Sequence, residues 1–275
     1  DEYKGTLWAA KWLPDSRQLV GQALEGTRVR LVRVDVASGA VTVVWCGSMS
    51  GGMPMPGGWT MSMAWMRMPG QTWLGAATSF MGMWVAMMVA MMLPSLVSML
   101  AVYRRAVGGA GRGRLDALTA IAGAGYFLVW AAVGAAVYPA GIALGAAEMR
   151  WPALARSVPL ATGLVLLLAG MVQLGPWKAR QLCRCRDAPG GAPLPAGTGT
   201  AWRYGLRLGA RCGLCCASLM AVLLVAGVMD LGAMALVAAA VTAERLAPWP
   251  EWAARAAGAI VVAAGALATV RALPA

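Results

Sequence analysis

The chain has 275 residues, of which 60% are hydrophobic and only 12% are charged. This balance excludes an ordinary soluble domain and is typical of integral membrane proteins. The net charge of +12 does not indicate nucleic-acid binding, because the basic residues lie in short clusters between apolar runs. The absence of histidine argues against the common zinc sites and histidine-ligated haem, whereas nineteen methionines and six cysteines favour a soft metal.

Residues 1–45 differ in composition from the rest of the chain and predict short β-strands. Apolar and polar residues alternate with a period of two on either side of a polar turn at Glu25 and Gly26. The pattern WLPDSRQL followed by VDVASG resembles one repeat of the TolB-like (WD40-like) β-propeller family. One repeat cannot bury its own faces, so we expect further repeats upstream. The alternative is a small strand unit that packs on the membrane domain.

Residues 46–70 combine methionine with glycine and proline, as in SMSGGMPMPGGWTMSMAWMRM. The glycines and prolines predict a flexible, exposed backbone that lets several thioethers converge on one ion. Thioether sulfur is a soft ligand that suits Cu(I), although methionine also serves as an adaptable apolar filler in an interfacial tether. The candidate Cu(I) ligands in this segment are Met49, Met53, Met55, Met61 and Met63.

Residues 71–275 predict an all-α membrane domain, a polytopic bundle of about six transmembrane helices. Apolar runs occupy residues 73–102, 115–138, 154–174, 204–228, 231–243 and 253–270, and the fifth is short. Arginine-rich loops after the first and third runs fall on one side of the membrane, which predicts that this side is cytoplasmic. The methionine-rich segment is then extracytoplasmic. Lys178, beside Trp177, is typical of an interfacial anchor.

Methionine continues into the first apolar run at helical spacing. Residues three or four apart share one face of a helix, and the run contains two neighbouring stripes: Met83, Met87 and Met91, and beside them Met81, Met88 and Met92. Flexible packing is one interpretation. Because the stripes follow directly from the methionine-rich segment, we also expect them to provide Cu(I) ligands.

Five cysteines form two tight clusters near the predicted cytoplasmic side. LCRCR contains Cys183 and Cys185, and RCGLCCASLM places three further thiols on one helix face, at Cys212, Cys215 and Cys216. Thiolates bind soft metals, so we expect a metal site here. The alternatives are buried cysteines that act as small apolar residues and a redox pair of the C-x-x-C type.

Further residues extend this candidate site. Met220 lies one turn beyond the cysteines, and Arg207 and Arg211 precede them, where they could favour the thiolate form. Asp230 and Glu244 flank the short fifth run. Carboxylates at a membrane border are candidates for function, and the alternative is that they are solvated or paired there.

The strings MGMWVAMMVAMMLPS, WKARQLCRCR and GLRLGARCGLCCASLMAVLLVAGVMD resemble a bacterial family of predicted metal-binding integral membrane proteins, often labelled copper chaperones. The resemblance spans about residues 60–270 and implies a multi-span inner-membrane protein that handles copper. By position it implies these functional residues: Met87, Met88, Met91, Met92, Cys185, Cys212, Cys215, Cys216, Met220, Met229 and Glu244. Arg245 stands where members of the family often have lysine, and the strand-like segment stands where they usually have an apolar helix.

The sequence thus predicts a non-enzymatic membrane protein that binds Cu(I) through methionine and cysteine. Exchangeable thioethers outside and stronger thiolates inside would pass the ion across the membrane, or to a copper-donor or copper-acceptor protein. No ATP-binding loop motif occurs in the sequence. Two alternatives stay open: a membrane thiol–disulfide oxidoreductase that uses Cys183/Cys185 and Cys212/Cys215, and a structural subunit of a membrane complex.

Overall fold

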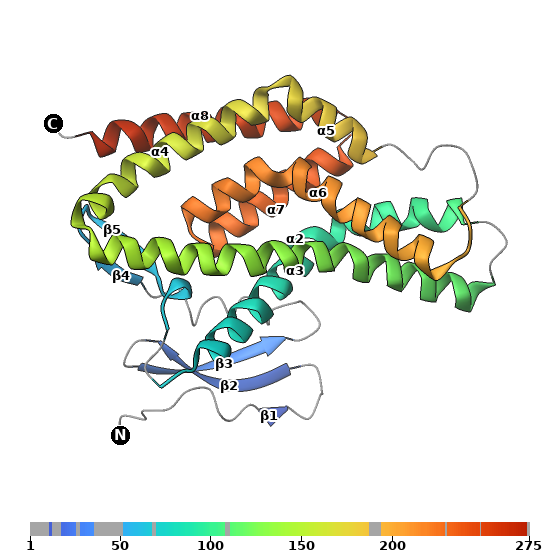
Figure 1. The fold of residues 1–275 in the computed structure, drawn as a ribbon, viewed down its shortest axis with the longest axis horizontal. Helices are drawn as coiled ribbons and strands as arrows, with labels where there is room; N and C mark the ends of the chain where they lie inside the picture. Colours follow the sequence, from blue (N-terminus) through green and yellow to red (C-terminus); the bar gives the residue numbers. More distant parts are fainter. Residues whose placement is uncertain are drawn as a thin grey trace.

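The computed structural model describes residues 11–12, 18–25, 28–35, 52–67, 70–107, 111–186, 194–228, 230–247 and 249–273 (Figure 1). Near the N-terminus, the antiparallel strands β1 (Lys11–Trp12), β2 (Gln18–Glu25) and β3 (Arg28–Asp35) form one sheet. Strands β2 and β3 pair from Gln18↔Asp35 to Glu25↔Arg28, on either side of the predicted turn. The strand prediction is confirmed, and the propeller resemblance stays a prediction.

Residues 52–62 of the methionine-rich segment form a β-hairpin, which the sequence did not predict. Much of the hairpin is exposed, as predicted, although Met55 and Met61 are buried. Strand β4 (Gly52–Met55) pairs with β5 (Trp59–Ser62), and a short 3-10 helix, η2 (Met63–Trp65), follows. The turn needs glycine, because Gly57 and Gly58 both have positive φ angles (108° and 77°). The Trp59 indole nitrogen donates a hydrogen bond of 2.8 Å to the Ala155 carbonyl, which fastens the hairpin to a helix.

Helices make up the rest of the described chain, and this confirms the predicted all-α bundle. In chain order they are α2 (Trp73–Ala106), α3 (Arg112–Arg150), α4 (Pro152–Leu174), α5 (Pro176–Arg186), α6 (Thr198–Ala226), α7 (Leu231–Leu246) and α8 (Pro250–Ala272). Thr72 caps α2 by accepting a hydrogen bond from the Gly75 amide, and Asp230 caps α7 by accepting one from the Ala233 amide.

Five helices of the described chain, rather than six, are long and apolar enough to cross a membrane: α2 over Trp73–Leu93, α3, α4, α6 and α8. Helix α7 has 16 residues and is about 24 Å long at 1.5 Å per residue, whereas a bilayer core is about 30 Å thick. The predicted fifth span is therefore corrected to a short helix. It packs between α2 and α8.

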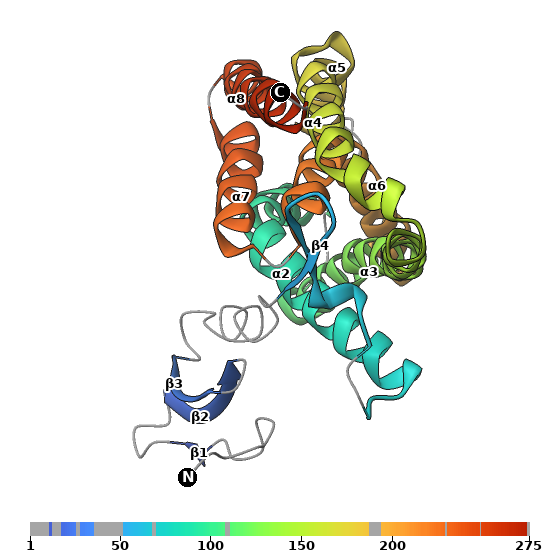
Figure 2. The same cartoon turned by 90° about the vertical axis from the view of Figure 1, so that its left-hand side faces the viewer.

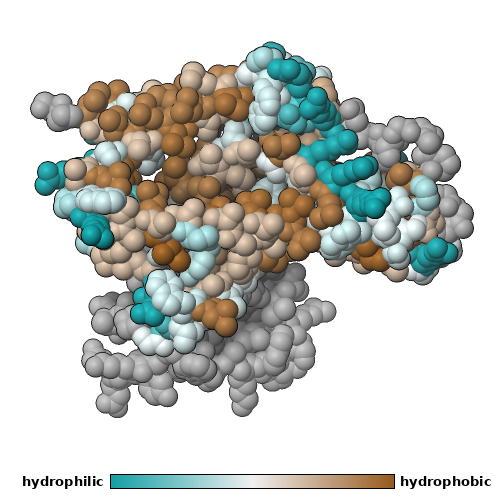
Figure 3. Space-filling model, viewed as in Figure 1, coloured by the Kyte–Doolittle hydropathy of each residue, from teal (hydrophilic) through white to brown (hydrophobic). Residues whose placement is uncertain are grey.

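The outer faces of the long helices carry large apolar side chains, as expected for contact with lipid. Leu128, Leu168, Ile260 and Leu267 are each about half or more exposed. Figure 3 shows apolar residues over much of the visible helical surface and a gathering of hydrophilic residues over α5.

Glycines allow the helices to approach closely, which is common in membrane bundles. Helices α4 and α8 lie side by side (Figures 1 and 2). Helices α3 and α6 meet at Gly205, where an added Cβ would collide with the Ala122 carbonyl, and at Gly209, where it would lie 2.9 Å from the Tyr126 carbonyl. This close contact brings Tyr126 against the cysteine-bearing turns of α6.

Candidate metal centre

The methionine stripe of α2 and the cysteine face of α6 meet in one buried core. The buried α2 methionines in this core are at most 4% exposed: Met83, Met87, Met88, Met91 and Met92. Cys212, Cys216 and Met220 of α6 belong to the same cluster, together with Met234 of α7. The sequence predicted each stripe separately, and the fold places them against each other.

Cys212 and Cys216 form a pair of neighbouring thiols on α6. Their Sγ atoms are 3.9 Å apart, and both side chains are fully buried. The Tyr126 hydroxyl lies 3.1 Å from the Cys212 Sγ as a hydrogen-bond donor. Within the described residues, no set of three or more cysteine, aspartate or glutamate side chains could by itself hold a metal ion. A third soft donor for this pair would come from the methionines of the same buried cluster.

Cys185 and Cys215 lie next to this pair, in a small cluster with Leu182 and Ala254. The Cys185 thiol donates a hydrogen bond of 3.2 Å to the Arg211 carbonyl. A side-chain hydrogen bond with Cys215 lowers the pKa of Cys185 to about 7, although burial opposes the shift. Cys183, two residues away on α5, is exposed and points elsewhere.

The cation that contacts the thiols is Arg245, which the sequence did not single out for this role. Its Nη2 atom lies 3.2 Å from the Cys212 Sγ and 3.8 Å from the Cys216 Sγ. Arg207 and Arg211, which the sequence predicted to favour the thiolate form, are both exposed. The charge of Arg211 contributes to the lowered pKa of Cys185, whereas the effect of Arg207 stays a prediction. Arg245 comes from α7, where a basic residue in the last turn would ordinarily be taken for a surface residue.

A buried polar network borders the thiols. Lys178 and Glu244, each 1% exposed, form an ion pair with a nitrogen–oxygen distance of 2.7 Å. Gln173 also donates to Glu244, and Ser218 donates to the Gln173 amide oxygen at 2.5 Å. The prediction that Lys178, beside Trp177, is an interfacial anchor was therefore wrong, because Lys178 lies in the core. Its ammonium group also donates a hydrogen bond of 2.8 Å to the Cys215 carbonyl.

Glu244, a candidate ligand, points into this network and has its carboxylate oxygens occupied by Lys178 and Gln173. Burial raises the pKa of Glu244, and the ammonium group of Lys178 opposes that shift. From the sequence, the alternative for Glu244 is pairing at the membrane border. Glu244 is indeed paired, but its partner is Lys178 and the pair lies in the protein core.

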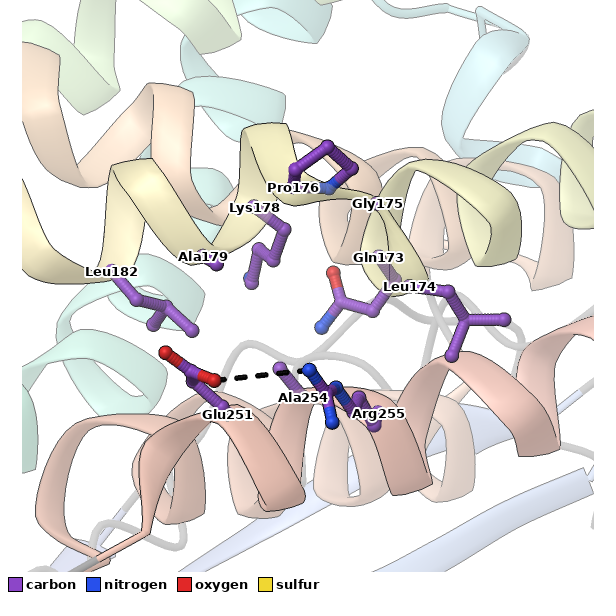
Figure 4. Close-up of a pocket in the computed structure, with 10 residues that line it drawn as sticks. All are labelled: Gln173, Leu174, Gly175, Pro176, Lys178, Ala179, Leu182, Glu251, Ala254 and Arg255. Carbon is purple, nitrogen blue, oxygen red and sulfur yellow. Dashed lines mark ion pairs between the residues drawn. The ribbon is translucent and has the colours of Figure 1, made fainter.

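A pocket of about 270 Å³ opens beside the network (Figure 4). Gln173 and Lys178 face it from α4 and α5, and Glu251 and Arg255, which form an ion pair of 3.8 Å, face it from α8. Leu182 and Ala254 line the pocket and also pack against Cys185 and Cys215. The pocket and the thiol cluster therefore share these two apolar side chains.

The fold does not bring the hairpin methionines to the thiols. Met55 and Met61 are buried in a separate cluster with Ala155, and Met53 is 39% exposed. Trp65 packs against both this cluster and the α2 core, and its ring centroid lies 5.6 Å from that of Phe80. Met49, Met229 and the side chain of Met63 lie outside the described residues.

A family model described as a copper chaperone, PpoB2, matches residues 81–268, which is more than half of the chain. The chain belongs to this copper chaperone family. The match begins within α2, at the methionine stripe, and ends within α8, so it contains both halves of the candidate centre. No curated protein and no solved structure matches the chain.

The sequence interpretation of this family member missed several residues of the centre. Met99 Sδ lies 3.8 Å from Arg245 Nη1, and its position seven residues after Met92 continues the second stripe, so its spacing could have identified it. Met234 stands on α7 without a periodic partner. No sequence spacing could have identified Arg245 or Gln173, because the residues that they contact are distant in the chain.

Proposed function

We propose that this protein is an integral membrane copper chaperone that binds Cu(I) in the core between α2, α6 and α7. The observation that carries the proposal is the burial of five α2 methionines in one cluster with Cys212, Cys216 and Met220. Thioether and thiolate sulfur are the donors that Cu(I) prefers. The family's copper chaperone description favours a role in handling copper rather than catalysis.

The path we infer runs from the methionines to the thiols. Met53 and the hairpin capture the ion outside the cytoplasm, and the α2 stripe passes it inward. Cys212 and Cys216 hold it more tightly, because thiolates carry charge and thioethers do not. The orientation follows from the arginine-rich segments on the other side, which the positive-inside rule assigns to the bacterial cytoplasm. The protein thus lies in the inner membrane.

The pocket beside α5 and α8 provides the way out. Leu182 and Ala254 of its lining pack against Cys185 and Cys215, and Lys178 of its lining donates a hydrogen bond to the Cys215 carbonyl. A copper-acceptor protein or a small thiol that enters from the cytoplasmic side would reach Cys185 and Cys215 first. The ion would then leave by exchange between sulfur ligands, which needs neither ATP nor a covalent step.

Anaerobic titration of the detergent-purified protein with Cu(I), against a competing chelator, tests this function. We expect tight binding in the wild type and in Cys183→Ser, a control in which the altered thiol is exposed. Cys212→Ser/Cys216→Ser should lose the tight site. Wild-type protein that cannot compete with a weak chelator would refute the proposal, as would equal affinity in the wild type and the double variant.

The thiol–disulfide oxidoreductase alternative has less support from the geometry. An exchange relay needs paired thiols, yet Cys183 is exposed and Cys185 is buried on the same short helix. Residues two apart on a helix do not face each other. Cys183 and Cys185 therefore do not face each other, although the oxidoreductase hypothesis needs them as a thiol pair.

A further inference from the structure

The guanidinium group of Arg245 is buried among sulfur atoms. The residue is 6% exposed, and its two terminal nitrogens contact Cys212, Cys216 and Met99. No carboxylate in the described part of the chain forms an ion pair with it, and its Nε atom has no hydrogen-bond partner there. A permanent positive charge therefore faces a soft-donor site.

Such a charge needs compensation. Arginine cannot lose its proton in a protein, and a buried charge without a partner is strongly unfavourable. The neighbouring carboxylate of Glu244 is already matched by Lys178 at 2.7 Å. The charges of Lys178 and Glu244 cancel, so the positive charge of Arg245 is left uncompensated. Of the described groups that contact Arg245, only the sulfur atoms could balance this charge as thiolates.

The sulfur pair fits a metal complex of the opposite charge. Metal–thiolate bonds are about 2.3 Å long in zinc sites. With bonds of that length, sulfurs 3.9 Å apart subtend about 115° at one ion, which leaves room for a neutral third donor such as a methionine sulfur. Two thiolates around a monovalent cation carry a single negative charge, which cancels that of Arg245. Around a divalent cation they are neutral, and the charge of Arg245 stays uncompensated.

We propose that Arg245 is a specificity-determining residue that makes the Cys212–Cys216 site select monovalent soft cations, Cu(I) and Ag(I), over Zn(II). It does so as a fixed counter-charge and is not itself a ligand. This inference rests on the proposed function and deepens it, because ligand softness alone does not separate thiolate binding of Cu(I) from that of Zn(II).

The test compares Arg245→Gln, Arg245→Lys and the control Arg271→Gln, which removes an exposed arginine from the last turn of α8. Cu(I), Ag(I) and Zn(II) affinities are measured by chelator competition on the full chain in detergent. We expect Arg245→Gln to weaken Cu(I) and Ag(I) binding on the order of 100-fold, as for close charge pairs elsewhere, without weakening Zn(II) binding. Arg245→Lys should keep most of the preference, and Arg271→Gln should keep all of it.

Equal losses for all three ions in Arg245→Gln would mean a merely structural role and would overturn the inference, as would no loss at all. If that variant does not fold, wild-type protein loaded with Ag(I) is challenged with excess Zn(II), and displacement of Ag(I) would overturn the inference as well. Wild-type protein that binds no Cu(I) refutes the proposed function itself. Tight wild-type binding with an unchanged ion preference in Arg245→Gln refutes only the role of Arg245.

Discussion

Substitution of Lys178 by methionine should destabilise the protein far more than its single charge suggests. Lys178 and Glu244 are each 1% exposed and 2.7 Å apart, and removal of one partner of a buried ion pair costs about 3–5 kcal/mol because the other charge stays buried. Loss of the hydrogen bond to the Cys215 carbonyl adds about 1 kcal/mol. The double substitution Lys178→Met/Glu244→Gln removes both charges and should recover much of this loss.

The free energy of unfolding in detergent, measured by denaturant titration, tests this prediction. Glu251→Gln is the matched control, because it breaks the Glu251–Arg255 pair, whose side chains are 54% and 63% exposed. An exposed pair contributes only about 0–1 kcal/mol. If Lys178→Met costs no more than this control, or if the double substitution is worse than the single one, the pair is not the buried interaction described above.

Three other variants probe the core, a helix contact and the pocket. Met87→Leu/Met91→Leu conserves side-chain volume, so it should lower the free energy of unfolding by less than about 1.5 kcal/mol per site. It should also remove the Cu(I) bound by the α2 methionines, which metal analysis would count. An unchanged number of bound ions would mean that these methionines serve packing alone. Gly205→Leu collides with the Ala122 carbonyl and should lower stability by at least about 1–3 kcal/mol in a thermal scan; wild-type stability would contradict the contact. Ala254→Trp should fill the pocket and slow Cu(I) transfer to a small chelator several-fold in a time course, with equilibrium affinity unchanged; an unchanged rate would exclude this exit.

The long helices could be predicted because their apolar runs are stronger than any competing pattern. Their ends were less predictable: α3 continues through Pro139 to Arg150, although a proline commonly kinks or ends a helix. The hairpin was missed because its glycines and prolines were interpreted as flexibility. Pro56, Gly57 and Gly58 instead form a tight turn, and the stability of the strands depends on burial against α4, which local sequence does not contain.

The sulfur faces of the candidate centre could be predicted, because spacings of three and four residues place side chains on one side of a helix. Their meeting could not, since it depends on how α2 and α6 pack. The charged residues that contact the thiols could not be predicted for the same reason. Arg245 lies 33 residues from Cys212, and no periodicity relates two such positions on different helices.

The contacts of Glu244 suggest a role that differs from the one its place in the sequence suggested. As a ligand it would be a hard oxygen donor beside soft sulfur, a poor match for Cu(I). As a partner of Lys178 it fixes an ammonium group that also holds the Cys215 carbonyl. Because Arg245 is the next residue in the chain, the same anchor sets where its guanidinium group meets Cys212. We therefore propose that Glu244 acts on the proposed metal site by positioning the groups that face it, and that the ligands of this site are sulfur atoms.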